Sequence, residues 1–108
     1  MPRTDGREVR AAWTRALQLT ATIEQHPYRL LSDLVAAMAD ERGGAPALID
    51  QQGALSYRSL TERTNQYSRW ALARGIKAGE VVALLMHNRA DYLAIWLGIT
   101  AVGGVVAL

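Results

Sequence analysis

The stretch VVALLMHNRADYLAIWLGITAVGGVVAL, residues 81–108, decides the fold. Residues 81–86 are apolar without alternation, which is typical of a strand that is buried on both faces of a parallel sheet. Residues 91–102 predict a helix, which Gly103 and Gly104 end. Residues 105–108 favour a second buried strand. This order of elements predicts a parallel, right-handed crossover and therefore an α/β fold with the start of a mostly parallel sheet.

The apolar strand at 105–108 is followed by no polar residue. A buried strand needs neighbours that pair its backbone groups and cover its faces. We therefore expect the 108 residues to be the amino-terminal part of a longer chain whose remainder supplies those neighbours. We divide them into a helical lead-in, residues 1–45, and the incomplete start of a large domain, residues 46–108.

The residues before position 81 predict three helices and a β-hairpin. Apolar residues at helical spacing, with caps and glycines at the ends, mark the helices. Ser32 and Ser56 are the expected N-caps of the second and third helices, and Gly75 is the expected left-handed residue after the third. The predicted elements are helix 7–19, a break at His26–Tyr28, helix 33–42, strands 47–50 and 55–57 around a turn at 51–53, and helix 57–74.

Composition excludes several classes of function. Without cysteine the chain has no disulfide and no thiolate nucleophile. The net charge is +2 and the basic residues alternate with acidic ones, so we expect no nucleic-acid partner. The arginines among the first fifteen residues lie beside Asp5 and Glu8, which indicates a solvated helix face. The polar opening is unlike a signal peptide and makes the cytoplasm the expected location.

The uncharged run at residues 92–108 has two interpretations. A membrane-inserted segment is one, because the run is only slightly shorter than the about 20 apolar residues that a spanning helix needs. A buried helix followed by a buried strand is the other, and the interrupting glycines Gly98, Gly103 and Gly104 favour it.

Motifs that would carry chemistry are absent from the sequence. It has neither a G-x-G-x-x-G nor a Walker A loop, and His26 and His87 lack metal-ligand spacing. We therefore assign no catalytic, cofactor-binding or metal-binding residue. Trp13, Trp70 and Trp96 fall on predicted helices, where packing in the core or against another subdomain is the expected role, in preference to a stacking platform.

The loop His87–Asn88–Arg89 has two interpretations. It follows a buried strand at the carboxyl end, where open α/β sheets bind ligands, and it precedes a helix amino terminus, which favours anions. It would then contact a nucleotide or a substrate. Alternatively it is a connecting loop in which Asn88 or Asp91 caps the helix, and this is the interpretation that we favour.

Two groups of segments together resemble a known family. The first is LSYRSL at 55–60, with Asn65, WAL at 70–72 and Gly75. The second is GEVVAL at 79–84, followed by Asn88–Arg89, Asp91–Tyr92, WLG at 96–98 and GGVVAL at 103–108. In this order they resemble the beginning of the adenylate-forming (AMP-binding) synthetases. The similarity looks greatest to the long-chain and very-long-chain acyl-CoA synthetases, the branch of the fatty acid transport proteins, which WTRAL at 13–17 and Pro27 also resemble. Ala90 departs from the pattern, because the family usually has proline there.

The resemblance implies an acid–thiol ligase that makes acyl-CoA from a fatty acid through an acyl-adenylate. ATP, Mg²⁺ and coenzyme A are then the expected cofactors of the parent enzyme, none of them bound by these residues. Its expected partners are a fatty acid or other carboxylate, coenzyme A, the remainder of its own chain and, peripherally, a membrane. The family's catalytic motifs have no matching positions here, so we expect the segment itself to be an inactive scaffold.

Three alternatives stay open at this stage. The parent enzyme could belong to another adenylate-forming branch, such as the aromatic-acid CoA ligases. It could instead contain a peptide-synthetase adenylation domain. The residues could also form a non-catalytic α/β binding module.

Overall fold

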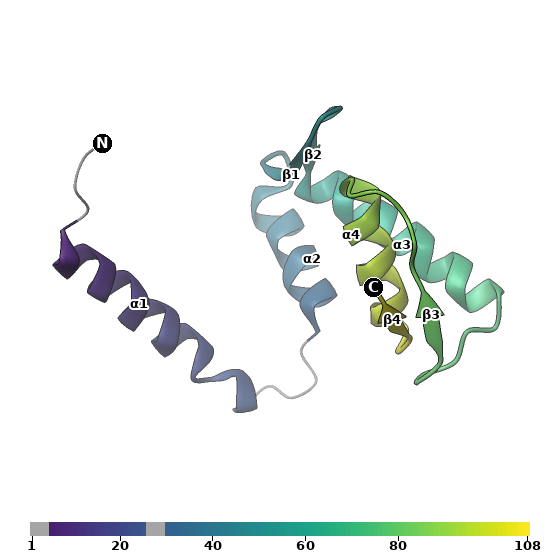
Figure 1. Ribbon diagram of the computed structural model, residues 1–108, viewed down its shortest axis with the longest axis horizontal. Coiled ribbons are helices and arrows are strands. Elements are labelled where there is room, and N and C mark those ends of the chain that lie inside the picture. Colours follow the sequence, from purple (N-terminus) through teal and green to yellow (C-terminus); the bar gives the residue numbers. More distant parts are fainter. Residues whose placement is uncertain (1–4, 26–29) are drawn as a thin grey trace.

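The computed structural model describes residues 5–25 and 30–108, and it confirms the α/β fold class (Figure 1). The predicted break at His26–Tyr28 lies outside the described residues. The elements in chain order are α1 (Gly6–Thr20), the 3₁₀ turn η1 (Ile23–Gln25), α2 (Leu31–Arg42), β1 (Pro46–Asp50), β2 (Gly53–Ser56), α3 (Tyr57–Ala73), β3 (Val81–Ala83), α4 (Ala90–Ala101) and β4 (Val105–Ala107).

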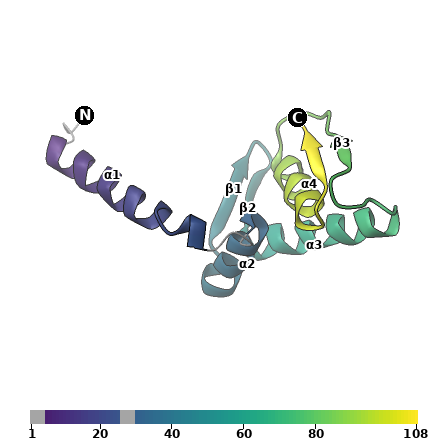
Figure 2. The same cartoon turned by 90° about the horizontal axis from the view of Figure 1, so that it is seen from below.

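The core lies where α3 and α4 pack side by side, with α2 against both (Figures 1 and 2). Leu60 of α3 and Ala94 and Leu97 of α4 are buried there. Gly98 lets the two helices approach closely, because a Cβ at this position would lie 2.7 Å from the Thr64 carbonyl oxygen and from the Tyr67 Cβ. The Ser68 hydroxyl donates to the Gly98 carbonyl at 2.8 Å and so fixes the same contact.

The strands β3 and β4 pair in parallel, with α4 as the crossover between them. Val81 pairs with Val105 and Ala83 with Ala107, as the sequence predicts for a strand, helix and strand. The predicted strand at 81–86 is however only three residues long, although the Leu84 amide still donates to the Ala107 carbonyl.

The prediction that both strands are buried on two faces is wrong for the described residues. Side chains alternate between half-buried and exposed along β3 and β4, and Val81 and Val105 are exposed. Leu85, just after β3, is 99% exposed. The reason is that each strand has one paired neighbour, so that the helices cover a single face of this two-stranded sheet.

The predicted β-hairpin is confirmed. Strands β1 and β2 are antiparallel, Asp50 pairs with Gly53, and Gly53 has a φ of 130° that the turn requires. The second strand ends at Ser56, one residue earlier than expected, because Tyr57 already begins α3.

Helix α3 begins and ends as the sequence predicts. The Ser56 hydroxyl accepts the Ser59 amide at 3.1 Å, which makes Ser56 the N-cap. At the other end, the Gly75 amide donates to Leu72 and the Ile76 amide to Ala71, which is a Schellman motif.

Helix α2 begins one residue before the expected N-cap. Ser32 lies inside its first turn and Leu30 holds the N-cap position, so the prediction for Ser32 is wrong. The Asp33 carboxylate accepts the Leu30 amide at 3.0 Å, and this satisfies the start of the helix without a hydroxyl cap. Gly43 ends the helix as predicted. The boundary proposed between residues 45 and 46 stays a prediction, while α2 packs on α3 and α4.

Helix α1 matches the predicted helix 7–19, and the Asp5 carboxylate accepts the Arg7 amide as its N-cap. None of its residues is buried, and it stands apart from α2, α3 and α4 in both views (Figures 1 and 2). Trp13 is 67% exposed, and Trp70 is 47% exposed and lies against Arg74, so neither packs in the core of the described residues. Packing of these two side chains against another subdomain stays a prediction. Trp96 is partly buried in α4.

No helix among residues 5–25 and 30–108 is long and apolar enough to cross a membrane. In the uncharged run at 92–108, the structure has α4 ending at Ala101 and β4 beginning at Val105. The interpretation as a helix followed by a strand is therefore the one that the structure supports.

Candidate functional site

The end of the β1–β2 hairpin and the loop before α4 lie together and enclose an open hollow of about 650 Å³. The hairpin contributes Leu48, Ile49, Asp50 and Gln51 to its lining. The loop contributes His87, Asn88 and Arg89, and the first turn of α4 contributes Ala90, Tyr92 and Leu93. Residues about forty positions apart in the sequence thus form one surface, at the carboxyl end of β3 as the sequence predicts for the loop.

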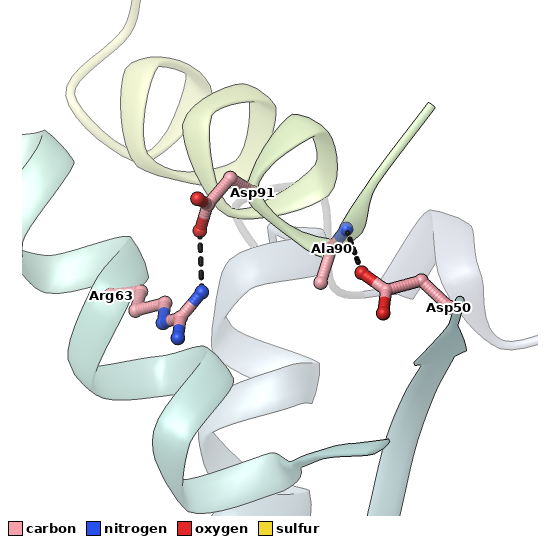
Figure 3. A network of polar contacts seen from close by, with 4 residues as sticks. All are labelled: Asp50, Arg63, Ala90 and Asp91. Atoms are coloured by element: carbon pink, nitrogen blue, oxygen red, sulfur yellow. Dashed lines mark hydrogen bonds and ion pairs between the residues drawn. The ribbon is translucent and has the colours of Figure 1, made fainter. Parts of the chain in front are cut away.

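Asp50 is the residue that connects the two sides of this hollow. Its carboxylate accepts the Gln52 amide at 2.8 Å within the hairpin turn and the Ala90 amide at 3.2 Å across the hollow (Figure 3). These amides, the Gln52 amide first, lower the pKa of Asp50 below its usual value of 3.8, and Arg89 adds a smaller electrostatic contribution. The carboxylate is therefore held in its charged form at the amino terminus of α4.

A second contact holds the same turn of α4 from the opposite side. The Arg63 guanidinium of α3 donates to the Asp91 carboxylate at 2.6 Å (Figure 3). Both side chains keep some exposure to solvent, so this ion pair orients the helix more than it stabilises it. The amino terminus of α4 is thus fastened to the hairpin by one contact and to α3 by the other.

The predicted caps of α4 are wrong. Arg89 holds the N-cap position and makes no side-chain cap hydrogen bond, and neither Asn88 nor Asp91 caps the helix. Asp91 instead pairs with Arg63, and the free Ala90 amide is satisfied by Asp50 from the hairpin. The position of Asp50 before the turn at 51–53 indicates that its side chain stabilises the turn. No local sequence pattern shows that the second carboxylate oxygen of Asp50 accepts the Ala90 amide.

This arrangement changes what the hollow can bind. A helix amino terminus favours anions, but here a carboxylate of the chain itself already accepts the first amide of α4. A phosphate at that point would meet the negative charge of Asp50. His87, Asn88 and Arg89 are exposed along the rim, and their contact with a nucleotide or substrate stays a prediction.

The described residues do not fit the cofactors that the resemblance implies for the parent enzyme. They hold no group of three acidic, histidine or cysteine side chains placed to bind a metal ion. The helix amino terminus beside the hollow carries its own carboxylate in place of an open phosphate site. We therefore derive no step through ATP, Mg²⁺ or coenzyme A at the residues of this segment.

A second, apolar hollow of about 490 Å³ lies between α3, β3 and α4. Its lining contains Tyr67 and Trp70 of α3, Val82 and Leu84 at β3, and Ile95 and Ile99 of α4. It presents no group of polar side chains that could carry out chemistry, which distinguishes it from the hollow at Asp50.

The chain belongs to the AMP-binding enzyme family, whose pattern it matches over residues 35–108. This match begins within α2 and extends to the end of β4, and so covers most of the part of the fold that packs as one unit. The coarser part of the resemblance, membership of the adenylate-forming enzymes, is thereby confirmed.

Curated relatives share moderate identity with the chain. A plipastatin synthase of Bacillus subtilis (strain 168) is 32% identical over 95 residues, which are 86% of this chain and 3% of that protein. Enterobactin synthase component F of Escherichia coli (strain K12) is 35% identical over 74 residues, 68% of this chain and 6% of that protein. The chain therefore spans only a small fraction of the length of these relatives.

Solved structures share the fold at lower identity. VinN matches with a TM-score of 0.69 at 24% identity, over 72% of this chain and 21% of its own. The anthranilate CoA ligase AuaEII in complex with anthranoyl-AMP matches with the same TM-score at 23% identity, over 73% of this chain and 15% of its own. The amino-terminal subdomain of NpsA from Klebsiella oxytoca matches with a TM-score of 0.66 at 20% identity, over 70% of this chain and 19% of its own. These matches confirm that the fold is that of the amino-terminal part of adenylate-forming enzymes.

Proposed function

We propose that the chain is the scaffold segment of a ligase that activates a carboxylic acid as an acyl-adenylate and then transfers it to a thiol. The observation that carries the proposal is the family match over residues 35–108. In the first step a carboxylate oxygen bonds to the α-phosphorus of ATP and pyrophosphate leaves. In the second step a thiolate bonds to the acyl carbon and AMP leaves.

The part that these residues play is to build and hold the first layer of the large domain. The close contact at Gly98 fixes α4 against α3, and α4 in turn sets the parallel register of β3 and β4. Asp50 and Arg63 then hold the loop at 87–89 in place through the first turn of α4. The chemistry is assigned to residues outside this segment.

The acid that we favour is an amino acid, in the manner of a peptide-synthetase adenylation domain. Several relatives support this branch, among them bacitracin synthase 2 of Bacillus licheniformis and tyrocidine synthase 2 of Brevibacillus parabrevis, both 28% identical to the chain. They align over most of the chain, whereas none of these relatives is a fatty acid ligase.

Fatty acids are the second candidate class of substrate. Their support is that the ordered segments of residues 55–108 look most similar to the long-chain and very-long-chain acyl-CoA synthetases. Residues 13–17 and Pro27 also resemble that branch, and they lie outside the matched range 35–108. With either acid the thiol is coenzyme A or a carrier-bound thiol, and the proposed location is the cytoplasm.

The experiment begins with the gene beyond the codon for Leu108. We expect a Ser/Thr/Gly-rich loop followed by lysine within about a hundred codons, the usual phosphate-binding chemistry of a glycine-rich loop. The encoded protein is then assayed for acid-dependent exchange of pyrophosphate into ATP with amino acids, aromatic acids and long-chain fatty acids. Exchange with an amino acid supports the favoured branch, and exchange with fatty acids alone supports the second candidate class of substrate. If none of the acids supports exchange, the proposed ligase function is contradicted.

A variant of the rim of the hollow tests the scaffold role in the same assay. We expect Arg89→Gln to leave the exchange rate within about twofold of the wild type, because an exposed side chain that touches no substrate has little effect. A loss of tenfold or more in kcat/KM, about 1.4 kcal/mol, would show that the loop contacts a ligand after all.

A further inference from the structure

The hairpin of β1 and β2 is held firmly at its base and weakly at its tip. At the base, Ala47, Leu48 and Leu55 pack against the buried cluster that α3 and α4 form. Towards the tip, Ile49 is 80% exposed, and residues 51–54 are exposed as well. Apolar packing therefore fixes one end of the hairpin, whereas the position of its tip depends on other contacts.

The segment between β3 and α4 is held in a similar way. The Leu84 amide still donates to β4, but residues 85–88 form no backbone hydrogen bond with another described residue. Leu85 is fully exposed and residues 87–89 are exposed, so side-chain packing holds little of this segment either. Regular backbone structure resumes with the first turn of α4.

A single hydrogen bond connects these two loosely held segments. Within residues 5–25 and 30–108, the bond from the Ala90 amide to Asp50 is the one hydrogen bond between the hairpin and residues 84–93. Figure 3 shows Asp50 reaching this amide from the end of β1. We infer that this bond controls the width of the hollow. While the bond is made, the hairpin tip and residues 85–89 stay together, and when it breaks they separate. This conformational role does not depend on the ligase activity.

The residue at position 90 makes the bond possible. Ala90 is the first residue of α4, and the amide at that position of a helix has no acceptor within the helix. Proline is well tolerated there, because the N–H that it lacks would have no partner in the helix. Alanine keeps the N–H, and Asp50 is its acceptor. A proline in place of Ala90 would therefore leave the hairpin and α4 unconnected at this point.

The bond also requires a carboxylate, because Asp50 serves both segments at once. Its Oδ1 accepts the Gln52 amide and its Oδ2 accepts the Ala90 amide. An amide side chain has a single acceptor oxygen, so asparagine at this position could serve only one of the two oxygen positions. The bond to Gln52 lies within the same turn and is the one that asparagine should keep. Asp50→Asn and Ala90→Pro therefore break the same contact from opposite sides.

The test measures the distance between the two segments in solution by pulsed electron spin resonance. The chain has no cysteine, so Gln51→Cys and Asn88→Cys introduce one spin label on each segment, at exposed positions that line the hollow. We expect a narrow distance distribution with Asp50 and Ala90 in place. Asp50→Asn should shift it to longer distances and make it about twofold wider, because the tip and the loop then move independently.

A double-mutant cycle identifies the bond as the cause. Ala90→Pro should widen the distribution by the same amount as Asp50→Asn, and the double variant should widen it no further, because both changes remove one contact. Proline fits the backbone, since Arg89 before it is already extended, with a φ of −154° and a ψ of 168°. Ala90→Pro therefore decides the test even if Asp50→Asn does not fold.

Asp91→Asn is the matched control. It makes the same chemical change one residue further along α4, where it breaks the ion pair with Arg63 and not the contact with the hairpin. This variant should leave the distance distribution unchanged. The inference is overturned if neither Asp50→Asn nor Ala90→Pro widens the distribution, because apolar packing would then hold the two segments together. It is also overturned if Asp91→Asn widens the distribution as much, or if the distribution is already broad with Asp50 and Ala90 in place.

Discussion

Helices α3 and α4 pack against each other in the core, yet their ends are specified in different ways. Helix α3 begins at Ser56, whose hydroxyl accepts the amide of Ser59, and ends at Gly75, where a Cβ would meet no other atom. Helix α4 begins with an amide that Asp50 of the hairpin accepts, and ends at Gly103, where a Cβ would lie 2.9 Å from the Ala78 Cβ. Local residues thus define both ends of α3, whereas the start of α4 depends on a tertiary contact and its end adds a tertiary contact to a local glycine signal.

The comparison shows which features of a helix can be predicted from its own sequence. Both helices end in the same hydrogen-bond pattern, with Gly75 bonded to Leu72 and Gly103 bonded to Thr100. Both glycines therefore need a positive φ, whereas only Gly103 has another residue, Ala78, close to the position of a Cβ. Substitutions at equivalent positions should separate the cost of the backbone conformation from the cost of the packing.

The largest effect is expected where the two helices touch. Gly98→Leu places a side chain where a Cβ already approaches the Thr64 carbonyl to 2.7 Å, so α4 has to move away from α3. We expect the free energy of unfolding to fall by about 3 kcal/mol, measured by urea denaturation. Ala73→Leu, at an exposed position of α3, is the control and should change it by less than about 0.5 kcal/mol. Equal losses in the two variants would contradict the close packing at Gly98.

The next effect compares the two C-terminal glycines. Gly75→Ala forces a residue with a Cβ to a φ of 76° in open space and should cost about 1 kcal/mol. Gly103→Ala adds contact with Ala78 to the same backbone strain and should cost about 2 kcal/mol. Thermal unfolding of both variants measures the difference. If the two losses are equal, tertiary packing does not distinguish the end of α4 from that of α3.

A smaller effect is expected at the local cap of α3. Ser56→Ala leaves the Ser59 amide without its acceptor and should lower stability by about 1 kcal/mol. Ser56→Asp retains an acceptor and should restore most of this loss. Amide hydrogen exchange should show faster exchange in the first turn of α3 and no change in α4, since the cap acts on its own helix alone.

The smallest effect is expected at Asp50, and it should depend on pH. The folded chain holds the pKa of Asp50 below 3.8, so its carboxylate contributes stability above that pH, and the contribution is lost as pH falls through the lowered pKa. Asp50→Asn should remove this part of the acid dependence of unfolding, measured by urea midpoints from neutral to acid pH. It should also speed exchange of the Ala90 amide while the first turn of α3 keeps its protection. If the urea midpoints of wild type and variant fell equally as the pH was lowered, the bond from the Ala90 amide to Asp50 would not be made in solution.

The parts of the fold that depend on neighbouring residues were predictable from the sequence. Helix α3 with its cap and its glycine, the hairpin with its turn at 51–53 and the parallel pair of β3 and β4 all follow from local spacing and turn chemistry. The strand at 105–108 is correctly placed to within one residue. Each of these features rests on a signal within a few positions of the element that it specifies.

The parts that failed depend on what lies nearby in space. An apolar run such as residues 81–86 indicates that burial is favourable but not which element provides it, and in the described chain Val81 and Leu85 are exposed. The spacing of Trp13 predicts packing in a core or against a subdomain, although spacing shows only that the helix has an apolar face. At the hollow, the loop at 87–89 was located correctly, whereas the role of Asp50 follows from a contact across forty positions.

The bond between Asp50 and Ala90 also has a consequence for the order of folding. As the chain emerges during synthesis, α3 carries both of its end signals and can form once Ile76 is available. The first turn of α4 gains its acceptor only after the hairpin has closed and come to rest beside it, at the entropic cost of joining distant residues. We therefore expect the first turn of α4 to form late, after the hairpin is in place, and pulsed hydrogen exchange during refolding would show the Ala90 amide protected after the first turn of α3.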